Sequence, residues 1–477
     1  MNIATEFLKS SLSKEGSFIK TEEFINWLDI RKQAVNVNIE KIKFSELVNW
    51  GFDATSTDLI HDSGKFFSIE GIKVTTNWGQ NMQWSQPIIN QDEIGFLGII
   101  TKKFNGILHF LMQAKIEPGN INYVQLSPTL QATKSNYTQV HKGNPPTYLK
   151  YFLDRTGNKK ILLDQLQSEQ GARFLRKRNR NIIIEIEEEI KVYDDFCWLT
   201  LGQIHQLLLH DNLVNMDSRT VISGIPFGGY NAEIINLFDF ITPLYSSDNE
   251  YAKGMLISAI ENENHLNSNE EILSWFTHLK SFYELKVEKI PLQKIEKWCF
   301  TDEEIHHEDN KYFKVIPVRA EIANREVKSW TQPLVESVQQ GIIAFIIKKI
   351  DNVYHFLVQA KLEPGNLDVL EMAPTVQCLT GNYRDGFSEY VVPYLDYIMQ
   401  SKGSELEKYS TFQSEEGGRF FREQNQNIIV EADESEQFIN LPDNFIWMTL
   451  NQMKTFVQYN NYLNIQARSL MSAIGFI

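Results

Sequence analysis

The sequence lacks the motifs that mark several large protein classes. It has only three cysteines, Cys197, Cys299 and Cys378, which lie far apart and form no Cys-x-x-Cys pair. This spacing argues against a disulfide framework and against a thiolate metal site, so we expect small core residues. A glycine-rich dinucleotide fingerprint, a P-loop lysine motif and a His-Glu-x-x-His pair are also missing. These absences predict a protein with no stored cofactor and no metal site.

Long apolar runs are missing as well. The longest, such as GIIAFIIKKI at 341–350, are interrupted by charge before the roughly 20 residues that a membrane-spanning helix needs. The opening MNIATEFLKSSLSKEG lacks the apolar core of a signal peptide, so we expect no membrane association and a cytoplasmic location. The formal net charge of −15 opposes attraction to nucleic acid, and any anionic ligand requires a local basic cluster.

The sequence does contain an internal duplication. QAKIEPGN at 113–120 returns 246 residues later as QAKLEPGN, and 12 of the 25 positions from 113 to 137 recur without a gap. At the same offset, QSEQGARFLRKRNRNIII at 167–184 becomes QSEEGGRFFREQNQNIIV. A fixed period of this length indicates a duplicated structural unit.

The duplication divides the chain into three parts. We predict a first repeat over residues 1–222, a connector with some helix over 223–267, and a second repeat over 268–477. Each repeat opens with helical spacing, as in EEFINWLDIRKQAV, and continues with apolar or alternating stretches typical of strands. Asn105 and Gly106 predict a hairpin turn, because both residues tolerate positive φ. The pattern indicates an α+β (mixed α/β) fold, with a mixed sheet, helices and an N-terminal helical cap in each unit.

A basic segment distinguishes the first repeat from the second. SEQGARFLRKRN, which starts at Ser168, is predicted as a helix of about three turns capped by the serine hydroxyl. The first repeat has five positive charges in 173–180, whereas the corresponding residues of the second carry a net charge of one. Arg173 and Lys177 would share one helical face and bind a diphosphate, with Arg178 beside them. A solvated surface helix is the alternative, but the asymmetry favours a phosphate site in the first repeat.

A neutral polar segment of the first repeat also loses polarity in the second. Sugar hydroxyls require neutral donors and acceptors, so we expect this segment to contact a sugar. The alternative is that its side chains cap loop backbone. The remaining predicted ligand-contacting residues, in this segment and beside it, are Trp84, Asn120, Gln125, Ser127, Thr129, Gln131, Thr133, Ser135, Asn136 and Glu169.

Titratable residues near the octapeptide are candidates for proton transfer. Lys115 and Glu117 are two residues apart, so on a strand they point to the same face. Both repeats keep both charges beside an apolar strand, although a surface ion pair is the alternative. Tyr137 and His141 are candidate proton carriers. The tyrosine recurs in the second repeat, whereas the histidine aligns with a phenylalanine, and an exposed loop histidine is the alternative reading.

The segments QAKIEPGN, QLSPTLQATKSNYTQVHKG, QSEQGARFLRKRNRN and NLVNMDSRTVIS resemble the NDP-hexose 2,3-dehydratases of deoxysugar biosynthesis, and the likeness spans essentially the whole chain. The resemblance implies two tandem Nudix-like units, a homodimer and the substrate dTDP-4-keto-6-deoxy-D-glucose. The implied reaction eliminates water across C2–C3 to give dTDP-3,4-diketo-2,6-dideoxy-D-glucose, which a pathway ketoreductase or aminotransferase would consume. Nudix hydrolases bind magnesium through a glutamate-rich helix, but the corresponding segment here is basic, so metal-assisted hydrolysis would be lost.

This reaction assigns roles to the candidate residues. The C4 ketone acidifies the C3 proton, so elimination requires a base, donors for the enolate oxygen and an acid for the C2 hydroxyl. We assign the base to Glu117, enolate stabilisation to Lys115, and assistance to the leaving hydroxyl to Tyr137 or His141. Glu169 and a tyrosine phenolate are the alternative bases. We expect catalysis in the first repeat and a degenerate or auxiliary pocket in the second.

Two other functions are compatible with the sequence. A non-catalytic nucleotide-sugar-binding protein would keep the pocket without turnover. A Nudix-type pyrophosphatase would need magnesium and a carboxylate-rich helix.

Overall fold

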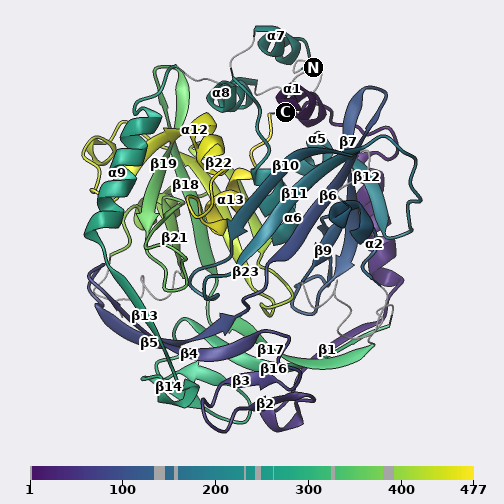
Figure 1. The fold of residues 1–477 in the computed structure, drawn as a ribbon. Helices are drawn as coiled ribbons and strands as arrows, with labels where there is room; N and C mark the ends of the chain where they lie inside the picture. Colours follow the sequence, from purple (N-terminus) through teal and green to yellow (C-terminus); the bar gives the residue numbers. More distant parts are fainter. Residues whose placement is uncertain are drawn as a thin grey trace.

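The computed structural model describes most of the chain (Figure 1). The described residues are 3–133, 145–154, 159–229, 232–241, 249–260, 263–323, 328–379 and 391–476. Within them, the strands form two sheets of seven strands and two sheets of five. The structure is therefore α+β, and the predicted fold class is confirmed.

The first repeat builds one seven-stranded sheet. Its strands are β6 (Gly95–Phe104), β7 (Ile107–Ile116), β8 (Val124–Ser127), β9 (Leu130–Ala132), β10 (Lys159–Ser168), β11 (Arg178–Ile186) and β12 (Phe196–Thr200). They pair in the order β10-β11-β6-β7-β12, with β8 on β7 and β9 on β6. Only the β11–β6 pair is parallel, which makes the sheet mixed. The predicted hairpin is confirmed, because Asn105 and Gly106 join β6 to β7 with φ of 51° and 79°.

The second repeat builds a sheet of the same design. Its strands are β18 (Gly341–Ile350), β19 (Val353–Lys361), β20 (Glu371–Ala373), β21 (Val376–Leu379), β22 (Glu407–Ser414), β23 (Gln424–Glu431) and β24 (Phe445–Thr449). The pairing matches that of the first sheet, including the parallel β18–β23 pair. The sequence duplication is thus a structural duplication.

Helices pack against both seven-stranded sheets. The α-helices are α1 (Ile3–Ser11), α2 (Thr21–Gln33), α4 (Leu149–Leu153), α5 (Leu201–Leu207), α6 (Met216–Ser223), α7 (Ala232–Ile241), α8 (Asn249–Ile260), α9 (Asn269–Phe282), α11 (Leu395–Ser401), α12 (Leu450–Phe456) and α13 (Ile465–Met471). The short 3-10 helices are η1 (Phe44–Glu46), η3 (Leu292–Lys294) and η4 (Glu436–Phe438). In α1, the Ser10 hydroxyl donates to the Leu108 carbonyl of β7, and in α8 Ser258 donates to Tyr354 of β19. The connector therefore contains a helix that matches the first helix of the chain.

The two repeats exchange strands in the five-stranded sheets, which lie at the bottom of Figure 1. The strands are β1 (Val37–Lys41), β2 (Trp50–Phe52), β3 (Leu59–His61), β4 (Ser68–Thr76), β5 (Gln83–Asn90), β13 (Leu285–Ile290), β14 (Trp298–Phe300), β15 (Ile305–His307), β16 (Phe313–Ile322) and β17 (Ser329–Ser337). Strand β1 pairs with β16 of the second repeat, and β13 pairs with β4 of the first. Separating the repeats would break both sheets.

The segment predicted as a helix from Ser168 is not helical. Ser168 is the last residue of β10, and Phe174 forms a parallel bridge with Ile89 before β11 begins. Arg176 has a φ of 53°, and its N–H donates to the Gly365 carbonyl of the second repeat at 2.7 Å. These long-range backbone hydrogen bonds outweigh the local helical propensity, which is a weak preference. The basic side chains therefore do not share a helical face.

Each octapeptide forms backbone hydrogen bonds with the other repeat. The Gly119 N–H donates to the Gly417 carbonyl at 2.7 Å, and the matching contact of Gly365 is 2.6 Å. A Cβ on Gly119 would lie 1.7 Å from the Phe420 carbonyl oxygen, and a Cβ on Gly365 would lie 1.7 Å from that of Phe174. Glycine alone permits such a close approach of two backbones. The near identity of the octapeptides therefore has a structural cause.

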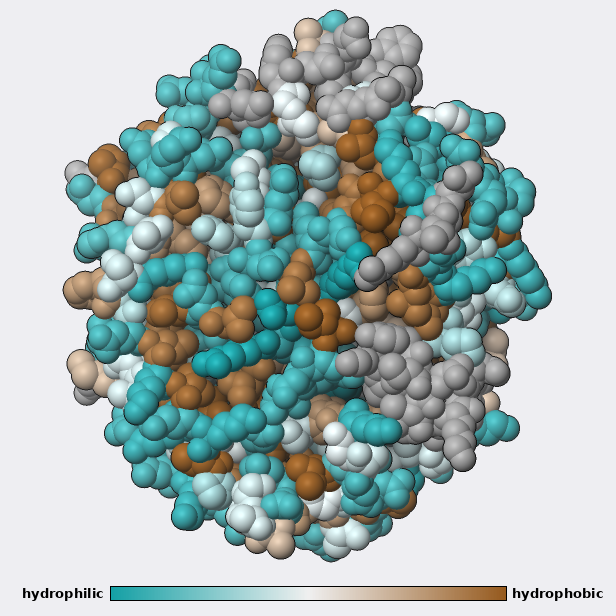
Figure 2. All heavy atoms as spheres, viewed as in Figure 1, coloured by the Kyte–Doolittle hydropathy of each residue, from teal (hydrophilic) through white to brown (hydrophobic). Residues whose placement is uncertain are grey.

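The surface is mixed in character. Figure 2 shows hydrophilic residues spread over one face, with hydrophobic residues in small groups between them. In the part of the chain that the structure describes, every helix is too short or too polar to span a membrane.

Candidate functional site

A cavity of about 780 Å³ lies at the end of β7, where residues from both repeats meet. The first repeat contributes the octapeptide strand, β9 and the beginning of β11. The second repeat contributes residues 329–332 of β17, together with Glu416, Gly418 and Arg419. The cavity is therefore composite.

Glu117 and Lys115 face this cavity from the octapeptide. The Lys115 Nζ lies 3.6 Å from the Glu117 Oε1, to which the Gln131 Nε2 donates at 2.7 Å. The Asn215 Nδ2 in turn lies 3.3 Å from the Gln131 Oε1 and fixes that amide. Glu117 is 4% exposed, and its Oε2 has no hydrogen-bond partner among the described residues. One carboxylate oxygen is thus held by donors, while the other is buried and lacks a hydrogen-bond partner in the part of the chain that the structure describes.

Four further carboxyl groups line the cavity, and those of Glu169, Asp217 and Glu416 lie in its buried part, whereas Asp195 is partly exposed. Burial is the main cause that raises the pKa of each of the three buried groups, to about 7 for Glu416 and well above the usual range for Asp217. Repulsion from neighbouring carboxylates, including Glu117, adds to this effect at Asp217 and Glu416. The cavity therefore gathers buried carboxyl groups whose pKa values are raised by burial and, at Asp217 and Glu416, by neighbouring carboxylates.

Four cationic side chains line the cavity beside these acids, namely Lys115, Lys177, Arg319 and Arg419. Lys177 donates to the Glu93 carbonyl, and burial lowers the pKa of its ammonium group. The Arg419 guanidinium lies 4.0 Å over the Phe67 ring, and its Nη2 donates to Gln91 at 3.1 Å. With Lys115, these side chains give the cavity the positive charge that a diphosphate requires.

The structure brings together about half of the predicted site. The predicted residues that line the cavity are Lys115, Glu117, Thr129, Gln131, Thr133, Glu169 and Lys177. Those that do not line it are Trp84, Asn120, Gln125, Ser127, Arg173 and Arg178. Four predictions lie outside the described residues, namely Ser135, Asn136, Tyr137 and His141.

Several of the predicted sugar contacts instead bond within the protein. The Ser127 hydroxyl accepts from Asn215 at 2.8 Å, and the Gln125 Oε1 accepts from the Ser414 hydroxyl at 2.7 Å. Thr129 lines the cavity, but its hydroxyl accepts from the Ile100 N–H and donates to a strand carbonyl. These side chains therefore already have hydrogen-bond partners within the protein.

Arg173 lies away from the cavity because the loop that holds it contacts the second repeat, and the matching loop that holds Arg419 contacts the first. Its guanidinium lies 4.1 Å over the Phe313 ring of the second repeat. The counterpart, Arg419, occupies the matching place in the first repeat's cavity. Likewise Trp330 lines the cavity, whereas Trp84 does not. The sequence offset identified matching residues correctly, but it could not show which cavity each one enters.

Asp217, Glu416 and Arg419 line the cavity but are not among the residues predicted from the sequence. Asp217 lies in the first turn of α6, whose N-cap Asn215 accepts from the Ser218 N–H at 2.9 Å. Asp217 belongs to the segment NLVNMDSRTVIS, and its replacement by Gln466 in the second repeat is a difference that the sequence shows. Glu416 and Arg419 could not be assigned to this cavity from the sequence, because they belong to the second repeat.

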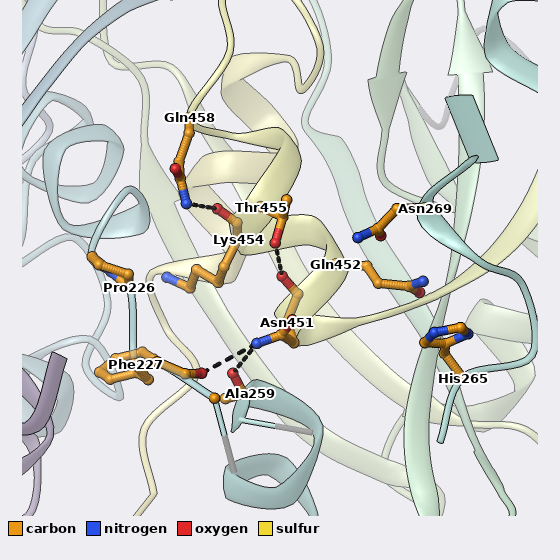
Figure 3. A pocket seen from close by; sticks show the side chains of 12 residues that line it. Pro226, Phe227, Ala259, His265, Asn269, Asn451, Gln452, Lys454, Thr455 and Gln458 are labelled. Carbon is orange, nitrogen blue, oxygen red and sulfur yellow. Dashed lines mark hydrogen bonds between the residues drawn. The ribbon is translucent and has the colours of Figure 1, made fainter. Parts of the chain in front are cut away.

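A smaller cavity of about 430 Å³ lies beside α12 and the start of the connector. Figure 3 shows Lys454 extending toward Pro226, and its Nζ donates to the Ser223 carbonyl at 2.6 Å. Burial lowers the pKa of Lys454 to about 7. Because no carboxylate is among the residues that line this cavity, it lacks the paired acid and base of the larger one.

Metal ligation has little support in the described residues. Among them, no three or more His, Cys, Asp or Glu side chains are arranged to hold a metal ion. The larger cavity mixes carboxyl groups with four cationic side chains, which would compete with a metal ion for those carboxylates.

Comparison with known proteins agrees with the duplicated architecture. The profile of a family described as NDP-hexose 2,3-dehydratase matches residues 21–225 and 269–474. The chain is 45% identical over 474 residues, 99% of this chain and 95% of the relative, to a dTDP-4-dehydro-6-deoxy-alpha-D-glucopyranose 2,3-dehydratase of Saccharopolyspora spinosa. Proteins of the same name from Amycolatopsis orientalis and Streptomyces violaceoruber are 41% and 39% identical, over 98% and 95% of this chain and 92% and 97% of theirs. The resemblance noted in the sequence is confirmed, and the chain belongs to the NDP-hexose 2,3-dehydratase family.

Proposed function

We propose that this protein eliminates water across C2–C3 of dTDP-4-keto-6-deoxy-D-glucose to give dTDP-3,4-diketo-2,6-dideoxy-D-glucose. The observation that carries the proposal is the Lys115–Glu117 pair, which faces a cavity large enough for a nucleotide sugar. The named activity of the relatives, at 39–45% identity over nearly the whole chain, supports the same reaction.

Glu117 is the proposed base. Its Oε2 is buried, faces no protein donor among the described residues and can accept the C3 proton, which the C4 ketone acidifies. The Lys115 ammonium lies 3.6 Å from the same carboxylate, close enough to stabilise the enolate oxygen that forms next to C3. Gln131 donates to the Glu117 Oε1 and so holds the carboxylate in place. Glu169, the alternative base, is buried in the same cavity, and its Oε1 already accepts from the Asn179 Nδ2 at 2.6 Å.

Cations and aromatic rings would hold the rest of the substrate. Lys177 and Arg419 can bind the diphosphate through charge-assisted hydrogen bonds. Trp330 and Trp50 line the same cavity and offer apolar faces for the base or the sugar.

Catalysis is assigned to the first repeat, residues 1–222, which holds the octapeptide strand of this cavity. Residues 223–267 are the proposed connector, and residues 268–477 form a repeat whose own pocket is degenerate or auxiliary. The loss of Asp217 and Lys177, which become Gln466 and Glu423, supports this division.

The wider setting follows the family. We propose Nudix-like units, a homodimer, a cytoplasmic location, and a ketoreductase or aminotransferase that consumes the diketone product. Size-exclusion chromatography with light scattering tests the dimer.

The reaction should need no added cofactor. We expect full dehydration in excess EDTA and without nicotinamide, because proton transfer by side chains suffices for an elimination next to a ketone. Loss of activity in chelator, restored by magnesium or zinc, would contradict this.

The test of function is direct. The purified protein is incubated with dTDP-4-keto-6-deoxyglucose, and mass spectrometry follows the loss of one water. Binding without turnover would identify a nucleotide-sugar-binding protein. Release of dTMP in magnesium would identify a pyrophosphatase.

A further inference from the structure

Glu416 belongs to the second repeat but faces the cavity of the first. A Cβ built on Gly418 would lie 2.5 Å from the Glu416 Oε1 and 3.9 Å from the Glu117 Oε1. The two carboxyl oxygens are therefore no farther apart than these two distances combined. Carboxyl groups from the two repeats thus meet at one point of the cavity wall.

The surroundings of Glu416 keep a proton on it near neutral pH. Burial is the largest influence and raises its pKa to about 7. Arg419 and Lys115 act against this rise, whereas Glu117 and Glu169 add to it. Asp217, on α6, faces the same group of carboxylates. A group with a pKa close to the working pH is well suited to donate a proton.

We propose that Glu416 is the general acid that protonates the C2 hydroxyl as it leaves, so that the second repeat supplies a catalytic residue to the site of the first. This inference rests on the proposed dehydration. Glu117 takes the C3 proton, and the electron pair forms the C3–C4 enolate. The enolate then forms the C2–C3 double bond as the C2–O bond breaks, and Glu416 gives its proton to the departing oxygen to make water. The enol at C3 becomes the ketone when C2 gains a proton.

The arrangement separates the acid from the base. Where carboxyl groups in one cavity differ in environment, the one held by donors acts as base and the one held neutral acts as acid. Glu117 has the Lys115 and Gln131 donors, whereas burial dominates at Glu416. Burial and the neighbouring carboxylates also raise the pKa of Asp217, which lies on α6 of the first repeat.

The residues around Glu363 of the second repeat do not include an acid that matches Glu416. The counterpart of Glu416 is Gln170, whose Nε2 donates to the Glu415 carboxylate. The first repeat's loop therefore shows that a glutamine is compatible with this loop conformation. Glu416→Gln is for that reason a mild substitution, and Gln170→Glu is its matched control.

The experiment separates proton abstraction from hydroxyl departure. We expect Glu416→Gln to lower kcat for dehydration about 10²–10⁴-fold, the usual contribution of a general acid. Solvent-deuterium exchange at C3 should continue in this variant. A substrate with fluorine in place of the C2 hydroxyl should lose fluoride within a few-fold of the wild-type rate, because fluoride leaves without a proton. Gln170→Glu should dehydrate the natural substrate within about threefold of wild type.

Two results would overturn the assignment. One is dehydration by folded Glu416→Gln at the wild-type rate. The other is loss of C3 exchange and of fluoride release together with dehydration, since Glu416 would then act before the hydroxyl leaves. If the glutamine variant does not fold, Glu416→Asp replaces it. Slowed dehydration with retained fluoride release would support Glu416 as the general acid. Equal slowing of both reactions would reject that role. Failure of the proposed function itself would show separately, as wild-type protein that never dehydrates.

Discussion

The two octapeptides end in the same scaffold but in different charge environments. In the second repeat, Gln377 donates to Glu363 at 2.8 Å and accepts from Asn464 at 2.7 Å, which repeats the chain from Asn215 through Gln131 to Glu117. The surrounding charges differ. The pairs that change, first repeat before second, are Asp217 and Gln466, Lys177 and Glu423, and Gln170 and Glu416. Packing keeps the scaffold symmetric, because backbone crossings fix it, whereas the ligand-facing charges are free to diverge.

The loops that pass between the repeats also decide which charged residues line the cavity. The loop that holds Glu416 and Arg419 starts in the second repeat and completes the first repeat's cavity. The loop that holds Gln170 and Arg173 faces the other way, where Gln170 donates to Glu415. The cavity beside the first octapeptide therefore takes its charges from both copies.

The two repeats should differ most in the effect of neutralising their matching glutamates. Glu117→Gln should lower kcat for dehydration about 10²–10⁴-fold, because the proposed base is lost. Glu363→Gln should stay within a few-fold of wild type. Dehydration and solvent-deuterium exchange at C3 are measured for both. If Glu363→Gln abolished turnover while folded Glu117→Gln kept it, the working site would lie in the second repeat.

Matching glycines should behave alike, since their role is structural. Gly119→Ala and Gly365→Ala should each lower the free energy of unfolding by more than about 3 kcal/mol, because a Cβ would overlap the facing carbonyl. Gly403→Ala is the control: its φ is 73° but the space around it is open, so it should cost about 1–2 kcal/mol. Urea denaturation measures all three. A large difference between Gly119 and Gly365 would argue against symmetric crossings.

The arginine pair tests the loop crossing. Arg419→Ala should raise KM about 30-fold, the equivalent of about 2 kcal/mol, because a charge-assisted contact to the diphosphate is lost. Arg173→Ala should change KM less, since its guanidinium lies over Phe313 outside the cavity. This order reverses the one that the basic segment of the first repeat suggests. Equal effects, or a larger effect of Arg173, would contradict the placement of the diphosphate.

The smallest effect concerns a buried pair outside the site. Burial lowers the pKa of Lys454 to about 7 and that of its counterpart His205 to about 3. The unfolded chain therefore binds more protons at Lys454 between pH 7 and the usual lysine pKa of 10.5, so stability rises with pH across that window. Relative to Lys454→Met, wild type should gain about 1 kcal/mol between pH 7 and 8.

His205→Gln is the control for that prediction. The wild-type histidine is neutral in the same window, so this variant should show the same pH dependence as wild type. Chemical denaturation at the two pH values measures both. An equal gain in Lys454→Met would show that the lysine is not the titrating group.

The sequence by itself determined the local structure and the duplication. Apolar spacing placed strands and helices, Asn105 and Gly106 marked the hairpin, and the matching octapeptides defined two units. It also placed Lys115 and Glu117 side by side, because residues two apart on a strand share a face. These features depend on neighbours in the chain, which periodicity reports directly.

Tertiary structure alone decided which parts of the two copies meet. Both repeats carry nearly the same loop, so sequence matching cannot tell whether Arg173 or Arg419 enters a given cavity. That choice follows from exchanged strands and from backbone crossings that only glycine allows, as at Gly119. The segment after Ser168 is extended for the same reason, since hydrogen bonds to the other repeat outweigh its helical propensity. Glu416 reached the cavity through this long-range packing, which no local pattern encodes.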